Sequence, residues 1–95
     1  MEHLYFVAYD IRCDKRWRKV YRTLKGYGVW LQYSVFQCRL DKARKLMLAD
    51  QLSLLIDRTE DHVVIIDIGP ADAVKPKVIS IGKPFEAIEK KPVIV

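Results

Sequence analysis

Ninety-five residues, of which 51% are hydrophobic and 31% charged, suit one ordered domain spanning residues 1–95 and exclude a disordered chain or a second core. No apolar run approaches the roughly 20 residues that a membrane-spanning helix needs, so no membrane partner is expected. The net charge of +5 favours polyanionic partners such as nucleic acids. Cys13 and Cys38 lack a CxxC spacing and no signal peptide is expected, which together predict a protein of the reducing cytoplasm.

The first half of the chain predicts a strand, a helix and a second strand. Leu4 to Tyr9 is apolar and aromatic on both faces, which is typical of a buried strand that ends at residue 10. Apolar residues then recur at 17, 20, 21 and 24, which predicts an amphipathic helix capped by Asp14 and ended by Gly26 in a left-handed conformation. Val29 to Leu40 is β-prone throughout and predicts one strand, kinked near residues 32–34.

The second half predicts another helix and further strands. Asp41 is the expected N-cap of a helix that runs to about Ile56 and has one broad core face. His62 to Gly69 and Lys77 to Ile81 are predicted strands, each ended by glycine. The tail, Pro92 to Val95, is a short β-prone run that we expect to add a strand to the sheet of a partner copy, the alternative being that it packs on its own chain.

This order of elements favours an α+β fold of ferredoxin-like shape. Two helices would pack on one face of a mainly antiparallel sheet, with a short C-terminal strand in addition. A complete ferredoxin-like pattern needs a hairpin between the two helices. The segment between the predicted helices contains no turn signal, so that element stays open at this point.

Basic residues surround the apolar stripe of the first predicted helix, and Arg12 lies just before it. Such a density of positive charge on one helix can follow a phosphate backbone, although a solvated helix face is the more common explanation. A second signal is therefore needed. The basic residues of the helix are Lys15, Arg16, Arg18, Lys19, Arg22 and Lys25.

Asp10 supplies that second signal, because it follows an entirely apolar strand at a position where carboxylates often face a ligand. It could equally end the strand or accept a hydrogen bond from a turn amide. Magnesium prefers carboxylate, phosphate and water oxygens, and it would polarise a phosphoryl group and activate water. One carboxylate is too few for such a site, but a two-fold homodimer would bring two copies of Asp10 together. Zinc is rejected because no close pair exists among Cys13, Cys38, His3 and His62.

Three segments together resemble the CRISPR-associated Cas2 family: LYFVAYDI at residues 4–11, DKRWR at 14–18 and QYSVF at 32–36. The resemblance implies a ferredoxin-like homodimer with magnesium-dependent endonuclease activity on RNA or DNA. It also implies partnership with the CRISPR adaptation integrase during spacer acquisition. By position, Asp10 matches the family's metal-binding aspartate and is expected to be catalytic, whereas Trp30 stands where many members carry a basic residue.

The expected nucleic-acid-binding residues combine those matched by the resemblance with the basic residues around the first helix. They are Tyr9, Arg12, Arg16, Arg18, Arg22, Ser34 and Phe36. The aromatic residues Tyr9 and Phe36 could pack in the core instead of stacking on bases. The alternative to an endonuclease is a non-catalytic homodimeric scaffold that binds DNA and bridges integrase subunits. A ferredoxin-like module for a small molecule ranks last.

Overall fold

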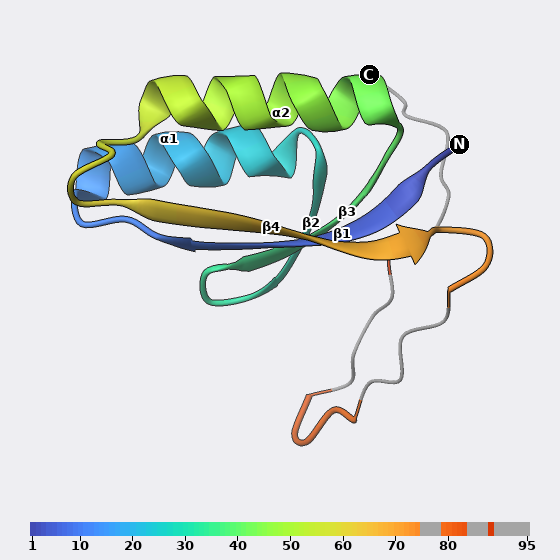
Figure 1. Ribbon diagram of the computed structural model, residues 1–95. Coiled ribbons are helices and arrows are strands. Elements are labelled where there is room, and N and C mark those ends of the chain that lie inside the picture. Colours follow the sequence, from blue (N-terminus) through green and yellow to red (C-terminus); the bar gives the residue numbers. More distant parts are fainter. Residues whose placement is uncertain (75–78, 84–87, 89–95) are drawn as a thin grey trace.

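The computed structural model describes residues 1–74, 79–83 and 88. Its four strands form one antiparallel sheet in the order β2-β3-β1-β4, and both helices lie on the same face of it (Figure 1). This βαββαβ arrangement is ferredoxin-like, so the predicted α+β class is confirmed. The elements are β1 (His3–Asp10), α1 (Asp14–Lys25), β2 (Gly28–Gln32), β3 (Val35–Leu40), α2 (Lys42–Leu55) and β4 (His62–Pro70).

The segment predicted as one kinked strand, Val29 to Leu40, is a β-hairpin instead. Tyr33 and Ser34 form the turn between β2 and β3, and Tyr33 has a positive φ of 42°. The indole Nε1–H of Trp30 donates a hydrogen bond to the carbonyl of Tyr33 at 2.9 Å. Tight hairpin turns normally place Gly, Asn or Asp at such a position, so the sequence carries no recognisable turn signal here.

The helix boundaries agree with the prediction, but two of the capping details do not. Cys13 is the N-cap of α1 and makes no capping hydrogen bond with its side chain, while Asp14 is the first helical residue. Gly26 ends this helix in a right-handed conformation, with φ of −78°, and not in the expected left-handed one. Asp41 is confirmed as the N-cap of α2, because its carboxylate accepts a hydrogen bond from the amide of Arg44 at 2.8 Å.

The C-terminal predictions fall partly outside the described residues. Residues 79–81 of the predicted strand Lys77 to Ile81 are described and are not in a strand, and Ile79 and Ile81 are 90% and 94% exposed. Residues 77 and 78 and the tail from Pro92 to Val95 lie outside the described part. Within that part, no helix is long and apolar enough to cross a membrane.

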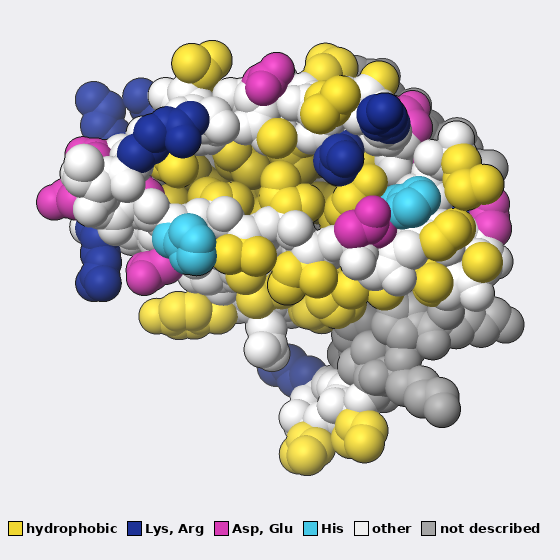
Figure 2. All heavy atoms as spheres, viewed as in Figure 1, with side chains coloured by type: hydrophobic (Ala, Val, Ile, Leu, Met, Phe, Trp, Pro, Cys, Tyr) yellow, Lys and Arg dark blue, Asp and Glu magenta, His cyan; other side chains and the backbone are white. Residues whose placement is uncertain are grey.

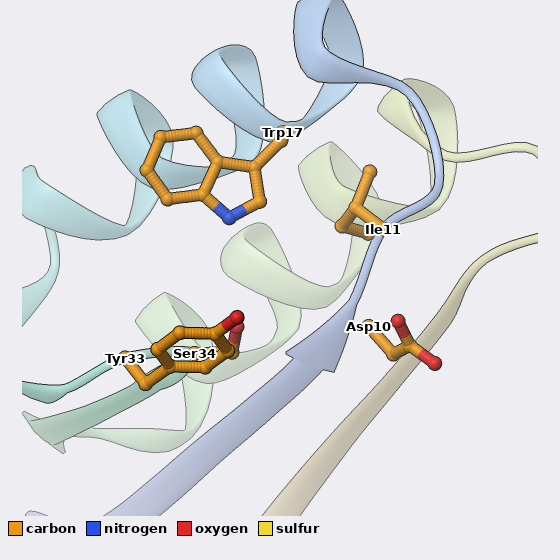
Figure 3. A pocket seen from close by; sticks show the side chains of 5 residues that line it. All are labelled: Asp10, Ile11, Trp17, Tyr33 and Ser34. Atoms are coloured by element: carbon orange, nitrogen blue, oxygen red, sulfur yellow. The ribbon is translucent and has the colours of Figure 1, made fainter.

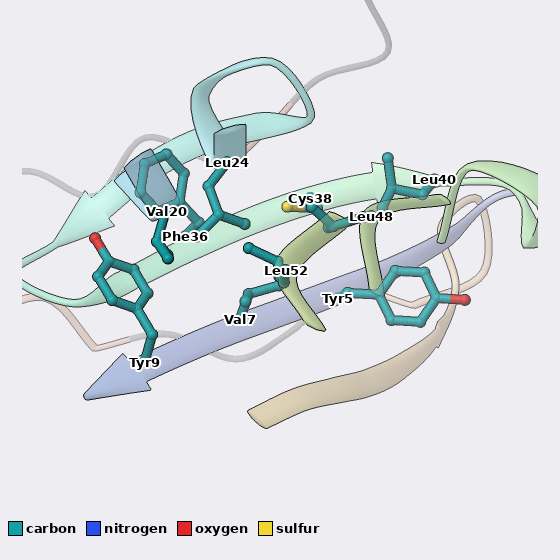
Figure 4. Close-up of a cluster of buried hydrophobic side chains, with 10 residues drawn as sticks. All are labelled: Tyr5, Val7, Tyr9, Val20, Leu24, Phe36, Cys38, Leu40, Leu48 and Leu52. Carbon is teal, nitrogen blue, oxygen red and sulfur yellow. The ribbon is translucent and has the colours of Figure 1, made fainter. Parts of the chain in front are cut away.

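The hydrophobic core lies between the sheet and the two helices (Figure 4). The core face of α2 is narrower than predicted, because Leu46, Met47 and Leu54 remain exposed. The opposite face of the sheet carries no helix (Figure 1). The core residues are Tyr5, Val7, Tyr9, Val20, Leu24, Phe36, Cys38, Leu40, Leu48 and Leu52.

Candidate active site

Asp10 is the last residue of β1 and pairs with His62 at the start of β4. Successive side chains of a strand point to opposite faces of the sheet. Because Tyr9 is buried on the helix side, the side chain of Asp10 lies on the face that the helices leave uncovered. The Asp10 side chain is 70% exposed, and the guanidinium of Arg12 lies 3.9 Å from its carboxylate. Such an exposed and loose pair contributes little stability, so the carboxylate stays available to a ligand.

A buried carboxylate, Asp61, anchors the loop that follows β1. Its side chain has no exposed surface and accepts hydrogen bonds from the backbone amides of Arg12 (2.9 Å) and Asp57 (2.8 Å). The Nε of Arg16 donates to it at 2.7 Å and a terminal nitrogen at 3.2 Å, and the same terminal nitrogen lies 3.1 Å from Glu60. The guanidinium of Arg16, helped by the two amides, holds the pKa of the Asp61 carboxyl far below its usual range although burial opposes this.

These contacts give Asp61 a positioning role. They join the loop after β1, the first turn of α1 and the segment before β4, and so fix the direction in which the chain leaves Asp10. Nothing in the sequence distinguishes Asp61 from other polar loop residues, and the sequence analysis missed it. Arg16, predicted to contact nucleic acid, is instead engaged in this cluster and only 25% exposed.

Two aromatic residues of the predicted nucleic-acid set lie in the core. Phe36 has no exposed surface and Tyr9 is 4% exposed, with their ring centroids 6.2 Å apart. Side chains buried in this way cannot stack on a base, so the expectation of a direct contact is corrected to a packing role. Burial, followed by the nearby Tyr21, raises the pKa of Tyr9. Its hydroxyl has no hydrogen-bond partner among the described residues.

A cavity of about 260 Å³ opens beside the candidate carboxylate (Figure 3). The backbone carbonyl of Ser34 accepts a hydrogen bond from the backbone of β1 at 3.0 Å, which joins the hairpin turn to the end of that strand. The predicted residues Asp10 and Ser34 therefore line one cavity, together with Trp17 and Tyr33, which were not among the predicted site residues. The complete lining is Asp10, Ile11, Trp17, Tyr33 and Ser34.

Basic side chains gather at the same end of the molecule. Figure 2 shows Lys and Arg side chains where α1 begins, close to the end of β1. Arg12, Arg18 and Arg22 of the predicted set are exposed. A polyanion bound there would meet positive charge on the loop after β1 and along α1.

The described part of the chain contains no group of three or more His, Cys, Asp or Glu residues that could together hold a metal ion. The exposed carboxylate of Asp10 is the kind of oxygen donor that magnesium prefers. A single copy of the chain therefore provides a suitable ligand but, over residues 1–74, 79–83 and 88, not a complete site. A second copy that contributed its own Asp10 would add a second carboxylate to this ligand set.

Comparison with known proteins connects this geometry to a family. The family model of CRISPR associated protein Cas2 matches residues 3–75. A protein of Geobacter sulfurreducens, named CRISPR-associated endoribonuclease Cas2, is 54% identical over 95 residues, covering 100% of both chains. A protein of Rhodospirillum rubrum with the name CRISPR-associated endoribonuclease Cas2 1 is 54% identical over 94 residues, covering 99% of this chain and 92% of the relative.

Solved structures agree with the sequence comparisons. A hypothetical protein of Thermus thermophilus superposes with a TM-score of 0.77 at 35% identity, covering 90% of this chain and 100% of that one. A crystal structure of Cas2 gives a TM-score of 0.73 at 30% identity, with 93% and 99% of the two chains covered. The family model covers most of the chain, and the chain therefore belongs to the family of CRISPR associated protein Cas2.

Proposed function

We propose that this protein is a magnesium-dependent endonuclease that cleaves RNA or DNA as a cytoplasmic homodimer during CRISPR spacer acquisition. The observation that carries the proposal is the exposed carboxylate of Asp10, which stands at a cavity beside a basic surface. The names of the relatives from Geobacter sulfurreducens and Rhodospirillum rubrum, both endoribonucleases, support the same activity.

In this proposal the Asp10 carboxylates of the two copies would hold the cation. Magnesium, when bound, would polarise the scissile phosphoryl group and make a water molecule more acidic. Arg12 and Arg18 neutralise neighbouring phosphates, and the hydroxyl of Ser34 donates a hydrogen bond to a phosphate oxygen. Asp61 keeps the loop of Arg12 in place through the backbone contact at 2.9 Å.

The apolar residues on the uncovered face of the sheet support the proposal of a homodimer. Strand pairing places Phe6 opposite Ile66 and Ala8 opposite Val64, so these four apolar side chains share one face. Val64 and Ile66 are 38% and 45% exposed, and Figure 2 shows hydrophobic side chains along β4 on the side away from the helices. Asp10 lies at the end of this same face. A second copy packed against it would bury the apolar residues and bring the two carboxylates toward each other.

Replacing Ile66 with lysine is expected to separate the dimer, because the charge would be buried at the proposed interface. We expect the dimer dissociation constant to rise at least about 30-fold, with loss of cleavage at low protein concentration. Sedimentation equilibrium measures the association. Leu54→Lys is the control, since Leu54 is exposed on α2, and it should leave the dimer intact. An unchanged dissociation constant for Ile66→Lys would place the interface elsewhere.

Charge reversal of Arg12 and Arg18 together is expected to weaken binding to nucleic acids of any sequence. Removal of two phosphate contacts should lower the slope of log affinity against log salt concentration by up to about 2 units. Arg16 is excluded from the test because its reversal would disrupt the cluster around Asp61. Lys42→Glu, an exposed change at the start of α2, serves as the control. If the slope of log affinity against log salt concentration is the same for the double variant and the wild type, Arg12 and Arg18 do not contact the phosphates.

The experiment that tests the activity is cleavage of labelled single-stranded RNA and of single- and double-stranded DNA, with magnesium or with EDTA. The proposal expects cleavage of at least one substrate with magnesium and none with EDTA. The scaffold alternative is favoured by the incomplete ligand set of one copy, and it expects DNA binding without cleavage in both conditions. Its bridging role, and the integrase partner that both functions share, can be tested by co-purification with the adaptation integrase.

A further inference from the structure

We infer that the cavity beside Asp10 receives one unpaired nucleobase of the bound strand, which stacks on the ring of Tyr33 and meets the indole N–H edge of Trp17. The inference rests on the proposed function, because it states how the substrate strand of that function occupies the same site. It specifies a single-stranded segment whose base enters the cavity while the adjacent phosphodiester lies at the carboxylate.

Tyr33 is presented to solvent at a conformational cost. Its side chain is 87% exposed, so burial does not explain a bulky ring at this turn. Its φ of 42° lies in the left-handed region, which bulky residues rarely adopt and which often marks functional sites. The hydrogen bond from Trp30 to the Tyr33 carbonyl, at 2.9 Å, holds this conformation. The turn therefore keeps an aromatic ring at the cavity where glycine would suit the backbone better.

Trp17 forms the opposite wall and is held firmly. Its ring stacks on Tyr21 with centroids 5.2 Å apart and an interplanar angle of 8°, and Tyr21 in turn packs edge-on against the buried Phe36 at 5.4 Å. In Figure 3 the indole nitrogen of Trp17 points across the cavity toward Tyr33. One wall is thus fixed by the core while the other stands on the hairpin turn.

The surroundings of the two rings suit a base more than another flat ligand. The cavity volume of about 260 Å³ is below the usual range for drug-sized ligands and suits a single ring system. Asp10 and Ser34 add polar groups to the lining, and Arg12, whose side chain is 68% exposed, lies beside Asp10 where the phosphate of the same nucleotide would be. Stacking on aromatic side chains is tolerant of base identity, and it requires a base that is free of its partner.

The test compares Tyr33→Gly, Tyr33→Phe and the control Leu54→Ala, whose side chain is also 87% exposed. Affinities for single-stranded RNA and DNA 12-mers and for a DNA duplex are measured by fluorescence anisotropy in EDTA, so that no cleavage contributes. We expect Tyr33→Gly to weaken single-strand binding about ten-fold while duplex affinity is kept. Its melting temperature should be equal or higher, because glycine adopts a positive φ without strain. Tyr33→Phe and Leu54→Ala should bind like the wild type.

Two results would overturn the inference: single-strand binding by Tyr33→Gly equal to that of the wild type, or an equal loss for single strands and duplex. The RNA and DNA arms identify which strand uses the cavity. The same titrations in an Asp10→Asn background separate this inference from the proposed function. A Tyr33→Gly loss that persists there for single strands but not for the duplex supports the cavity even if the protein proves not to cleave.

Discussion

Asp10→Asn is expected to abolish magnesium-dependent cleavage, with a loss of at least about 100-fold, while nucleic-acid affinity stays within about two-fold. Asparagine keeps the volume of the side chain but removes the negative charge that would hold the cation. Affinity should be preserved because the proposed phosphate contacts come from Arg12 and Arg18 and not from the carboxylate. The measurement is a single-turnover cleavage rate with magnesium, next to a binding titration in EDTA.

Asp14→Asn is the matched control for this substitution. Asp14 is an exposed carboxylate four positions further along the chain, in the first turn of α1, and it does not line the cavity. Its replacement should leave cleavage close to the wild-type rate. If a clean preparation of Asp10→Asn cleaves at the wild-type rate, the carboxylate of Asp10 is not required for cleavage.

Asp61→Asn is expected to have the largest effect on stability of the substitutions considered. The variant leaves the guanidinium of Arg16, which is 25% exposed, without its buried charged partner, and it places an amide nitrogen near other donors. The melting temperature at pH 7 should fall by roughly 10 °C or more. Glu60→Gln is the control, because Glu60 contacts the same guanidinium at 3.1 Å but is 57% exposed, and it should cost a few degrees at most.

The pH dependence of stability gives a second readout for the same carboxylate. The pKa of Asp61 in the folded protein lies below its ordinary value of 3.8, so the folded state binds fewer protons than the unfolded state in acid. The contribution of Asp61 to the free energy of unfolding is therefore present above about pH 4 and is lost progressively as the pH falls further. The difference in melting temperature between wild type and Asp61→Asn should narrow below that pH. A constant difference from pH 7 to pH 3 would contradict the assigned ion pair.

The sequence predicts those features that depend on local pattern. The apolar run before Asp10, the helical spacing of Val20 and Leu24 and the capping carboxylate of Asp41 each report a local preference, and the structure agrees with all three. The turn that divides the predicted strand Val29 to Leu40 into β2 and β3 was not predicted, because Tyr33 adopts a backbone conformation that its residue type disfavours. The hydrogen bond from Trp30 to the Tyr33 carbonyl and the one from the backbone of β1 to the Ser34 carbonyl hold the turn against that local preference.

In the candidate site, too, local features could be predicted from the sequence and contacts between distant residues could not. Asp10 and the basic helix are visible in the sequence, because a carboxylate after an apolar strand and a run of cations are local signals. The partner of Arg16 is 45 residues away in Asp61, and no pattern in a single sequence reveals that pairing. The prediction of Phe36 as a contact was wrong for a related reason, since alternation along a strand does not say which face the helices will cover.

We propose that two copies of Asp10 form one cation site in a homodimer. This is tested by isothermal titration calorimetry of manganese, as a stand-in for magnesium, into the wild-type protein and into Asp10→Asn. We expect one cation bound for every two chains in the wild type and no specific binding in the variant. One cation for every chain, or equal binding by the variant, would contradict it.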